Sequence, residues 1–499
     1  MRWNRLEPTR GRYEFDRWLG EPMKAAVEDD LYVTLMIWVR PGTPEWLFDE
    51  EGVPRVYTDR DVDPLGRKMD KENNLHPYYL HPAYKKSFGE LIDALGKYVS
   101  ELPMGLRERI LWVQSAEGST GDGSPYKGNP LDSRFAISEA NWSAFRRETW
   151  IRYQSALPGI PIVVNSDANS EEEYEWLLEN MEVLGLKHGM FSHGYHVSGN
   201  VERLRVFDKV AAEAERRGIE VLTRGEQDGE MFVYGWSTKN IPQALYWSGI
   251  FATHCRLDVW NVPHKALKDP ANFPAFAFFN RYAGLKDPEA SPRAFCALRD
   301  GLDASDFQRF PASEFGGVEG RKRDVDRYLK IAAAYAPYGA RMEDPEKALG
   351  GGMVNRKRNG YNDVGWGILP GNYSRFLTQV EPGSGDVGLW NVDDSIYGRF
   401  ARAFERKSGK TQMRFRLDER FDADQILVSV TYWDRGRGRW SIEVPDGTDR
   451  LRVSNSDSST WKTVSVQMPR GDLRHAELRL KYEGGDDTVF NMVEIEKVE

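Results

Sequence analysis

The chain has 499 residues, of which 40% are hydrophobic, 29% charged and 12% aromatic. This composition excludes a disordered or low-complexity protein, and the length has room for about two to four domains. The net charge of −9 comes without a basic stripe, so we expect no nucleic-acid partner. No apolar run approaches the ~18 residues of a membrane helix, so we expect no membrane partner.

Residues 1 to about 265 alternate between two patterns. The first consists of short apolar runs typical of buried strands: 32–39, 110–115, 160–165, 189–193, 220–224 and 256–262. Between them lie segments with helical spacing: 85–102, 138–155, 171–183, 200–217 and 243–250. Such alternation indicates an α/β domain with a parallel sheet. At this length we predict a (β/α)8 TIM-type barrel over residues 1–345.

The pattern changes to period two after Gly350-Gly351-Gly352. Strand-like runs separated by turn residues follow at 412–417, 426–432, 440–444, 463–468, 477–482 and 489–495. Regular short strands of this kind are typical of a β-sandwich, which we place at residues 350–499. Aromatic residues near 432–440 and 460–464 make it a possible carbohydrate-binding domain, and a domain that only braces the barrel is equally compatible with them.

The two cysteines, Cys255 and Cys296, are too few for a disulfide framework or a metal-ligand set. We expect both to be small buried side chains. No zinc-ligand spacing surrounds His193 and His196, and the glycine-rich segment 118–123 lacks the lysine of a phosphate-binding loop. The sequence therefore predicts no metal and no cofactor.

Two glutamates follow apolar strand candidates directly, each in a loop of small residues. Glu117 comes after the strand at 110–115, and Glu226 comes after the strand at 220–224. Catalytic residues of barrel enzymes lie where strands end, and a pair of carboxylates facing one pocket suits glycoside hydrolysis. A single glutamate in such a loop is more often an ordinary loop residue, so the argument depends on the pair.

Residues 3–15 read W-N-R-L-E-P-T-R-G-R-Y-E-F. They resemble the W-x-x-L-E-P-x-x-G-x-Y-x-F segment of clan A glycoside hydrolases, closest to the β-galactosidase and agarase-like branches. The P-x-W-L turn that ends at Leu47 resembles the third-strand end of the same clan. The resemblance covers about residues 1–265 and implies a retaining glycosidase with a carbohydrate substrate. It makes Glu117 the acid/base and Glu226 the nucleophile.

The same resemblance implies further contacts with the sugar. Tyr195 falls where the clan often has a tyrosine that touches the nucleophile, and Trp260 falls where an aromatic residue floors the site. His193 and His196 flank this tyrosine and are candidates for hydrogen bonds to sugar, while Trp38 and Trp46 are candidates for stacking.

Two features depart from the clan pattern. Ala116 stands where the clan has an asparagine that holds the sugar 2-OH, so Gln114, Ser115 or Asn165 would have to make that contact, or the sugar is substituted. A sulfated or acidic sugar would suit Arg40 and Arg224, although a structural salt bridge explains these arginines equally well. We therefore expect a β-linked galactose-type or modified poly- or oligosaccharide as substrate.

The second departure is at the start of the chain, where the second-strand motif begins at residue 3. We expect a barrel whose first strand is missing, or one completed by other segments. Residues 1–8 have no apolar region typical of a signal peptide, and analogy with polysaccharide degraders weakly favours a periplasmic or secreted protein. The alternative function is a non-catalytic glycan-binding protein on a degenerate barrel.

Overall fold

The computed structural model describes residues 1–62, 75–119, 123–165, 171–188, 201–227, 229–232, 240–321, 324–342, 363–366 and 371–498. The chain divides into two compact units, Met1–Gly189 with Val206–Arg224 and Met190–Arg205 with Gly225–Glu499. This division differs from the boundary expected near residue 350. The reason is that strand β9 (Arg293–Ala297) pairs with the C-terminal strand β22 (Val489–Val498), so contacts cross the expected boundary.

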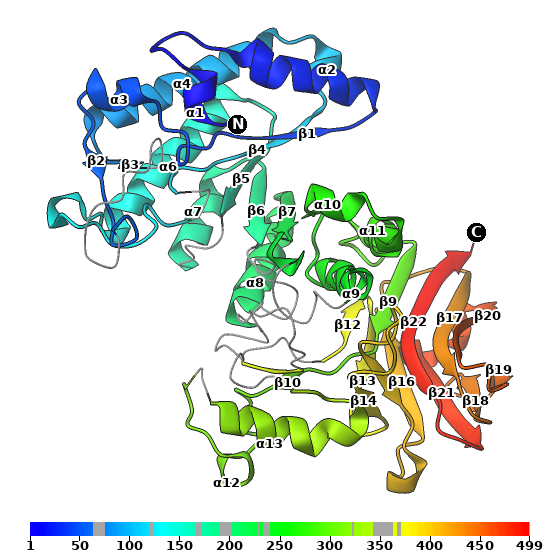
Figure 1. The fold of residues 1–499 in the computed structure, drawn as a ribbon. Helices are drawn as coiled ribbons and strands as arrows, with labels where there is room; N and C mark the ends of the chain where they lie inside the picture. Colours follow the sequence, from blue (N-terminus) through cyan, green and yellow to red (C-terminus); the bar gives the residue numbers. More distant parts are fainter. Residues whose placement is uncertain are drawn as a thin grey trace. The chain divides into compact units, whose positions relative to one another are not determined.

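The first unit alternates strands and helices, as the sequence pattern predicts (Figure 1). Its strands are β1 (Val33–Met36), β2 (Arg55–Val56), β3 (His76–Pro77), β4 (Ile110–Gln114), β5 (Ile162–Asn165), β6 (Leu184–His188) and β7 (Val221–Glu226), whose last two residues belong to the second unit. Its helices are α1 (Trp3–Leu6), α2 (Glu21–Glu28), α3 (Glu45–Asp49), α4 (Pro82–Glu101), α5 (Met104–Arg107), α6 (Glu139–Ala156), α7 (Glu171–Asn180) and α8 (Val201–Arg217), whose first five residues belong to the second unit.

Six strands form one sheet in the order β1-β4-β5-β6-β7-β8, with β8 at Val259–Asn261. The pairs β1–β4, β4–β5 and β5–β6 are parallel. Met1–Trp3 runs parallel to Met36–Trp38, with the Trp3 N–H donating to the Trp38 carbonyl at 3.0 Å. Within the described ranges the strand path ends at β1 and β8, so the predicted parallel α/β sheet is confirmed, while the closed (β/α)8 barrel stays a prediction.

One strand of this sheet was not predicted. It is β6, which spans Leu184–His188, while the strand predicted at 189–193 lies outside the described residues. Leu184 and Leu186 are both fully buried in the core of this unit, and their alternation is the period-two signal that the prediction missed.

The second unit begins with helices and continues into the sandwich. Its helices are α9 (Ile241–His254), α10 (His264–Leu267), α11 (Phe273–Tyr282), α12 (Ala312–Phe315) and α13 (Val325–Tyr335). Besides β8, β9 and β22, its strands are β10 (Leu302–Asp303), β11 (Val364–Gly365), β12 (Tyr373–Arg375), β13 (Leu377–Val380), β14 (Val387–Leu389), β15 (Ala401–Ala403), β16 (Gln412–Leu417), β17 (Gln425–Asp434), β18 (Arg439–Glu443), β19 (Asp449–Ser454), β20 (Thr460–Pro469) and β21 (Glu477–Gly484).

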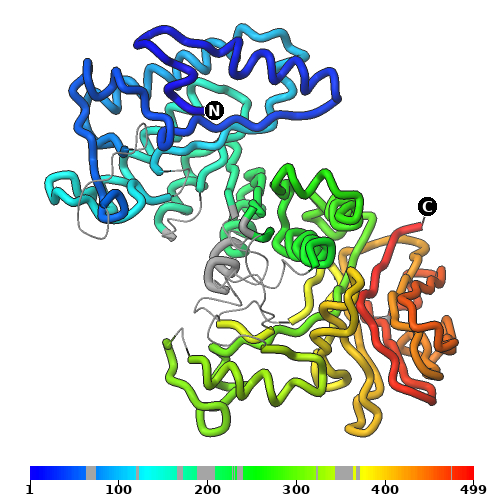
Figure 2. Tube along the Cα trace, viewed as in Figure 1, coloured from blue at the N-terminus to red at the C-terminus, as the bar shows by residue number. Residues whose placement is uncertain are grey.

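Two antiparallel sheets pack face to face in this unit. A seven-stranded sheet has the order β12-β9-β22-β15-β14, with β17 paired to β22 and β20 paired to β17, and a five-stranded sheet has the order β13-β16-β21-β18-β19. Alternate side chains such as Phe415, Leu480 and Val493 fill the space between them. The C-terminal strand returns to β9, as the chain trace shows (Figure 2).

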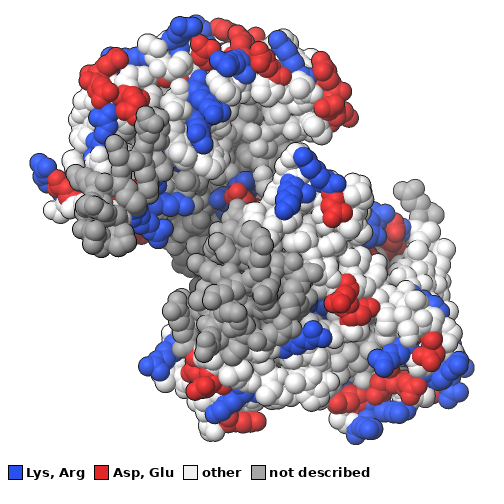
Figure 3. All heavy atoms as spheres, viewed as in Figure 1, with Lys and Arg blue, Asp and Glu red and all other residues white. Residues whose placement is uncertain are grey.

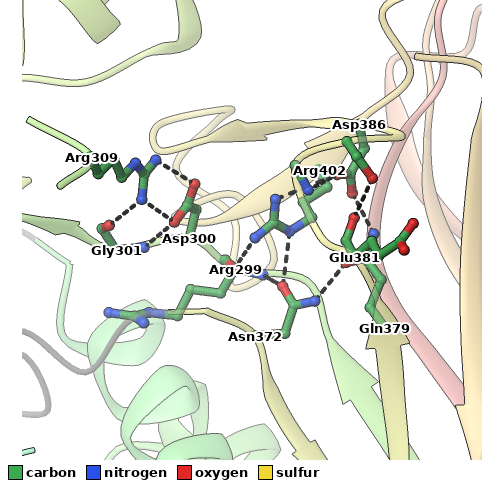
Figure 4. A network of polar contacts seen from close by, with 11 residues as sticks. Arg299, Asp300, Gly301, Arg309, Asn372, Gln379, Glu381, Asp386 and Arg402 are labelled. Atoms are coloured by element: carbon green, nitrogen blue, oxygen red, sulfur yellow. Dashed lines mark hydrogen bonds and ion pairs between the residues drawn. The ribbon is translucent and has the colours of Figure 1, made fainter.

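A buried polar network supports the sheet edge in this unit (Figure 4). Arg309 donates from both terminal nitrogens to the Asp300 carboxylate, at 2.9 and 2.8 Å. Arg402 on β15 donates to the Asn372 side chain at 2.9 Å and pairs with Asp386 at 3.5 Å. Because Arg309 and Arg402 each face a carboxylate, these two ion pairs support the β9–β10 connection.

Both cysteines are buried free thiols, as predicted. Burial raises the pKa of the Cys296 thiol to about 12. On the surface, lysines and arginines are interspersed with acidic residues on the face drawn in Figure 3. No helix among the described residues is long and apolar enough to cross a membrane.

Candidate active site

The N-terminal motif folds into a hydrogen-bonded unit around Glu7. Its carboxylate accepts from the Trp3 indole N–H and from the Gly11 backbone N–H, both at 2.8 Å. Gly11 has a φ of +72°, a conformation that glycine adopts without strain. Burial raises the pKa of Glu7, against the lowering effect of these two donors. The motif therefore fixes the path of the chain into the first unit.

The candidates that follow strand β1 are largely enclosed. Arg40 is 7% exposed and donates to Ser119 Oγ and to Asp61 Oδ1, both at 3.3 Å. Arg40 therefore forms a salt bridge with Asp61, as the structural alternative predicted. Trp46 is 6% exposed and packs edge-on against Trp3 in the core, with its indole N–H donating to the Glu7 carbonyl at 3.1 Å. Trp38 is half-buried.

Glu117 lies three residues beyond β4 and faces helix α6. Its side chain is 2% exposed, and Oε1 accepts from the Trp150 indole N–H at 2.5 Å and from the Ser115 hydroxyl. Oε2 lies 3.8 Å from the Arg146 Nε atom. Trp150 and Arg146 both lie on α6, so the Glu117 carboxylate packs against this helix.

Arg146 connects Glu117 to a second carboxylate. Its Nη1 atom donates to both oxygens of Glu173 on α7, at 3.1 Å each, and its Nη2 atom donates to the Asn165 carbonyl at 3.0 Å. The guanidinium lies over the Trp150 ring at 4.6 Å from its centroid. Burial raises the pKa of Glu173, and the nearby Glu117 carboxylate raises it further, while Arg146 opposes both.

A cleft in the first unit opens above this cluster. Arg146 and Glu173 line it, together with the first turns of helices α6 and α7. Its aromatic and charged lining includes Trp142, Trp176, Arg147, Glu139, Glu148 and Glu172. Sequence reasoning did not single out Arg146 or Glu173, because both lie on helices and give no local motif.

Glu226 is the last residue of β7 and is half-buried. Two strand neighbours, Thr223 and Arg224, are buried. The backbone N–H of Gln227 donates to the Asn261 carbonyl beside β8 at 2.8 Å, and the Gln227 amide is 2% exposed. Trp260 on β8 is 7% exposed and packs against Phe276 and Phe279. Glu226 thus ends a strand whose other polar residues are enclosed.

The remaining candidates divide into two groups. Gln114 on β4 and Asn165 on β5 are buried at the carboxyl ends of adjacent strands. His193, Tyr195 and His196 lie outside the described residues. Within the described ranges, no group of three or more His, Cys, Asp or Glu side chains is placed to hold a metal ion.

Comparison with known proteins identifies the class of the N-terminal segment. Residues 1–104 match the model of glycoside hydrolase family 42, described as β-galactosidase. This match confirms the resemblance to clan A glycoside hydrolases and the predicted enzyme class, a glycosidase. No curated protein sequence matches the chain.

Solved structures show only remote similarity. The catalytic domain of a β-amylase from Paenibacillus polymyxa aligns with 56% of this chain and 88% of its own, at 11% identity and a TM-score of 0.38. The C-terminal CBM6 of LamC from Zobellia galactanivorans aligns with 24% of this chain and 99% of its own, at 16% identity and a TM-score of 0.17. A calcium-binding mutant of β-glucuronidase 2 from Bacteroides uniformis aligns with 96% of this chain and 60% of its own, at 7% identity and a TM-score of 0.28.

Proposed function

We propose that this glycosidase is a retaining enzyme that cleaves β-linked galactose-type or modified saccharides, with Glu117 as acid/base and Glu226 as nucleophile. The observation that carries the proposal is the placement of one glutamate at the carboxyl end of β4 and another at the end of β7, two strands of the same sheet. We infer that this sheet belongs to a (β/α)8 barrel, in which these ends form the catalytic face.

The proposed chemistry has two displacements. Glu117 donates its proton to the glycosidic oxygen while the Glu226 carboxylate attacks the anomeric carbon, which breaks the C–O bond and forms a glycosyl ester. Glu117 then removes a proton from water, the water oxygen attacks the same carbon, and Glu226 leaves as carboxylate. The sugar is released with its configuration retained, and a carboxyl separation of roughly 5–5.5 Å goes with this route.

The burial of Glu117 adds a requirement. A side chain that is 2% exposed does not reach a glycosidic oxygen, so substrate binding has to be accompanied by rotation of Glu117 away from Trp150.

Substrate class is a separate part of the proposal. The Arg40 guanidinium is engaged by Asp61 and Ser119, in line with the salt-bridge alternative. We keep Arg224, near the end of β7, as a candidate contact for a sulfate or carboxylate group on the sugar. Ala116 offers no side-chain hydrogen bond to a sugar 2-OH, and this supports a sugar modified at or near that position.

The test uses an aryl β-galactoside with a good leaving group, and the product configuration is followed by NMR. We expect Glu226→Ala to abolish turnover while sugar binding remains. Glu117→Gln should slow hydrolysis of natural linkages by about 10²–10⁴-fold but affect the activated substrate less, because a good leaving group does not need a proton. Full turnover in Glu226→Ala, or an inverted product, would overturn the assignment. Binding without turnover in the wild-type chain would favour the non-catalytic alternative.

The sandwich has a surface that suits glycan binding. Trp433 on β17 and Trp461 on β20 are paired across the strands, with ring centroids 5.3 Å apart, and both are half-buried. The next pairs on the same face are hydroxyls, Thr431–Thr463 at 3.0 Å and Ser429–Ser465 at 2.8 Å. Aromatic faces and hydroxyls are the groups that contact sugar rings. We call these six residues the β17–β20 face.

A further inference from the structure

The loop that follows Glu117 is attached to the chain beyond the neighbouring strand β1, which pairs with β4. Ser119, two residues after Glu117, forms a parallel β-bridge with Arg40, which follows β1. The Arg40 guanidinium also donates from Nη1 to the Ser119 hydroxyl at 3.3 Å. Both residues are buried. The backbone and the side chain of Arg40 therefore hold the same residue of this loop.

Asp61 fixes the orientation of the Arg40 guanidinium. Its Oδ1 atom accepts from Arg40 Nη2 at 3.3 Å, and its Oδ2 atom accepts from the Thr58 backbone N–H at 2.9 Å. Asp61 and Thr58 are both fully buried. The carboxylate is thus held by the backbone of its own loop, and its charge-assisted hydrogen bond keeps the guanidinium turned so that Nη1 reaches Ser119.

The chain after Glu117 is held at two further points. The Trp142 indole N–H on α6 donates to the Gly123 carbonyl at 2.6 Å. The Leu131 backbone N–H donates to the Tyr57 carbonyl at 2.8 Å, so the loop that contains Asp61 also holds this later part of the chain. The contact with Arg40 is the one closest to Glu117 in sequence, and it is therefore the one that bears most directly on the position of Glu117.

We propose that Arg40 and Asp61 are positioning residues that fix the backbone beside Glu117, so that its carboxyl group is aimed at the glycosidic oxygen. The proposal rests on the proposed function, in which Glu117 is the acid/base. Proton transfer requires heavy atoms within about 2.6–3.2 Å of each other, and a misplacement of about 1 Å can slow a reaction roughly 100-fold. A side chain that has to rotate away from Trp150 keeps its aim only if its backbone stays in place.

The leaving group of the substrate separates this role from a general structural one. A poor leaving group needs the proton of Glu117, whereas the activated aryl β-galactoside does not. Arg40→Gln should therefore lower kcat/KM by about tenfold for an alkyl β-galactoside and by less than about twofold for the aryl substrate. Ser119→Ala keeps the backbone bridge and should show a smaller effect of the same kind. Equal losses on the two substrates would overturn the proposal.

A double-mutant cycle tests whether Arg40 acts through Ser119. Arg40→Gln combined with Ser119→Ala should lose little more than Arg40→Gln alone, because the second change removes a contact that is already lost. Arg40→Lys keeps the charge and should restore part of the rate on the alkyl substrate. Arg55→Gln is the matched control, since Arg55 pairs with two carboxylates at the surface of the same unit, and both rates should stay unchanged. Additive losses, or an equal loss in Arg55→Gln, would overturn the proposal.

Amide hydrogen exchange separates this inference from the proposed function, because it needs no turnover. In Asp61→Asn, peptides that cover residues 117–131 should exchange faster, while peptides of helix α4 should keep the wild-type rate. If the wild-type chain hydrolyses no glycoside but exchange rises in this way, the attachment stands and the assigned reaction fails. An unchanged rate in 117–131, or an equal rise in α4, would overturn the attachment. If Asp61→Asn does not fold, the same measurement on Ser119→Ala gives the answer.

Discussion

At the scale of single residues, His76 shows how burial fixes a protonation state. It is fully buried, its Nδ1 atom lies 3.0 Å from the Tyr79 hydroxyl, and its Nε2 atom accepts from the Lys127 backbone N–H at 3.3 Å. Burial lowers the pKa of His76 to about 2, and the charges of Arg40 and Lys127 act in the same direction. Since Nε2 accepts, the neutral ring carries its proton on Nδ1.

This histidine makes stability depend on pH. Below the ordinary histidine pKa near 6.5, the unfolded chain binds a proton at His76 that the folded chain does not bind. The stability that the neutral ring contributes to the fold is therefore complete above that pH and is lost as the pH falls. From pH 7 to pH 5 we expect a loss of about 2 kcal/mol in the free energy of unfolding. His76→Gln should remove most of this loss in urea titrations at the two pH values, whereas substitution of the exposed His264 should not. An equal loss in His76→Gln would contradict the assignment of a buried neutral ring.

At the scale of elements, helices α4 and α6 pack through glycines. Gly96 on α4 lies against Ala156 at the end of α6, and a Cβ at Gly96 would come within 2.8 Å of the Ala156 Cβ. Gly89, seven residues earlier, faces the Arg152 side chain in the same way. Two glycines at this spacing lie on one face of a helix and allow the close approach that holds α6, and with it Trp150 and Arg146.

Gly96→Ala should therefore destabilise the first unit, although alanine is the better helix former. We expect a loss of about 1–3 kcal/mol from overpacking, visible as a lower Tm in thermal unfolding. Gly105→Ala on α5 is the control, because a Cβ there meets nothing within 4 Å and the Tm should stay or rise slightly. A raised Tm in Gly96→Ala would contradict this, because it would show that α4 and α6 can move apart without loss of stability.

At the scale of the whole molecule, the proposed acid/base and the proposed glycan-binding face lie in different units, while the proposed nucleophile Glu226 belongs to the second unit. Glu117 lies in the first unit, and the β17–β20 face lies in the second. The seven-stranded sheet that carries this face has a core on each side, one shared with the five-stranded sheet and one shared with α9 and α11. The strands that carry this face are therefore anchored by packing within the second unit.

Trp433→Ala should weaken binding to an insoluble or long-chain substrate by roughly tenfold, because one stacking surface is lost. Turnover of a small aryl β-galactoside should not change. Trp18→Ala is a matched control, since Trp18 is also half-buried but lies in the first unit. Pull-down on polysaccharides and soluble-substrate kinetics measure the two effects. Equal binding by Trp433→Ala and the wild type would assign the sandwich a structural role.

The sequence predicted the helices and strands more closely than it predicted the surroundings of the candidate site residues. Period-two alternation predicted 412–417 as a strand, and β16 has these bounds because Met413, Phe415 and Leu417 all face one core. Helical spacing predicted α4 and α6 to within a few residues. The strand β9 was not predicted, since it is short and its stability comes from pairing with β22, almost two hundred residues later.

Local pattern by itself predicted the strands and helices of the α/β and sandwich regions, because periodicity is a property of neighbouring residues. The resemblance of the N-terminal motifs to a known family predicted the enzyme class, and the roles of the two glutamates stay predictions. Only the tertiary structure decided where each side chain points and what it meets. It enclosed Trp46 and Arg40, turned Glu117 toward Trp150, and joined Glu117 to Glu173 through Arg146. These contacts link residues up to dozens of positions apart, and their energies depend on burial, which no local sequence pattern records.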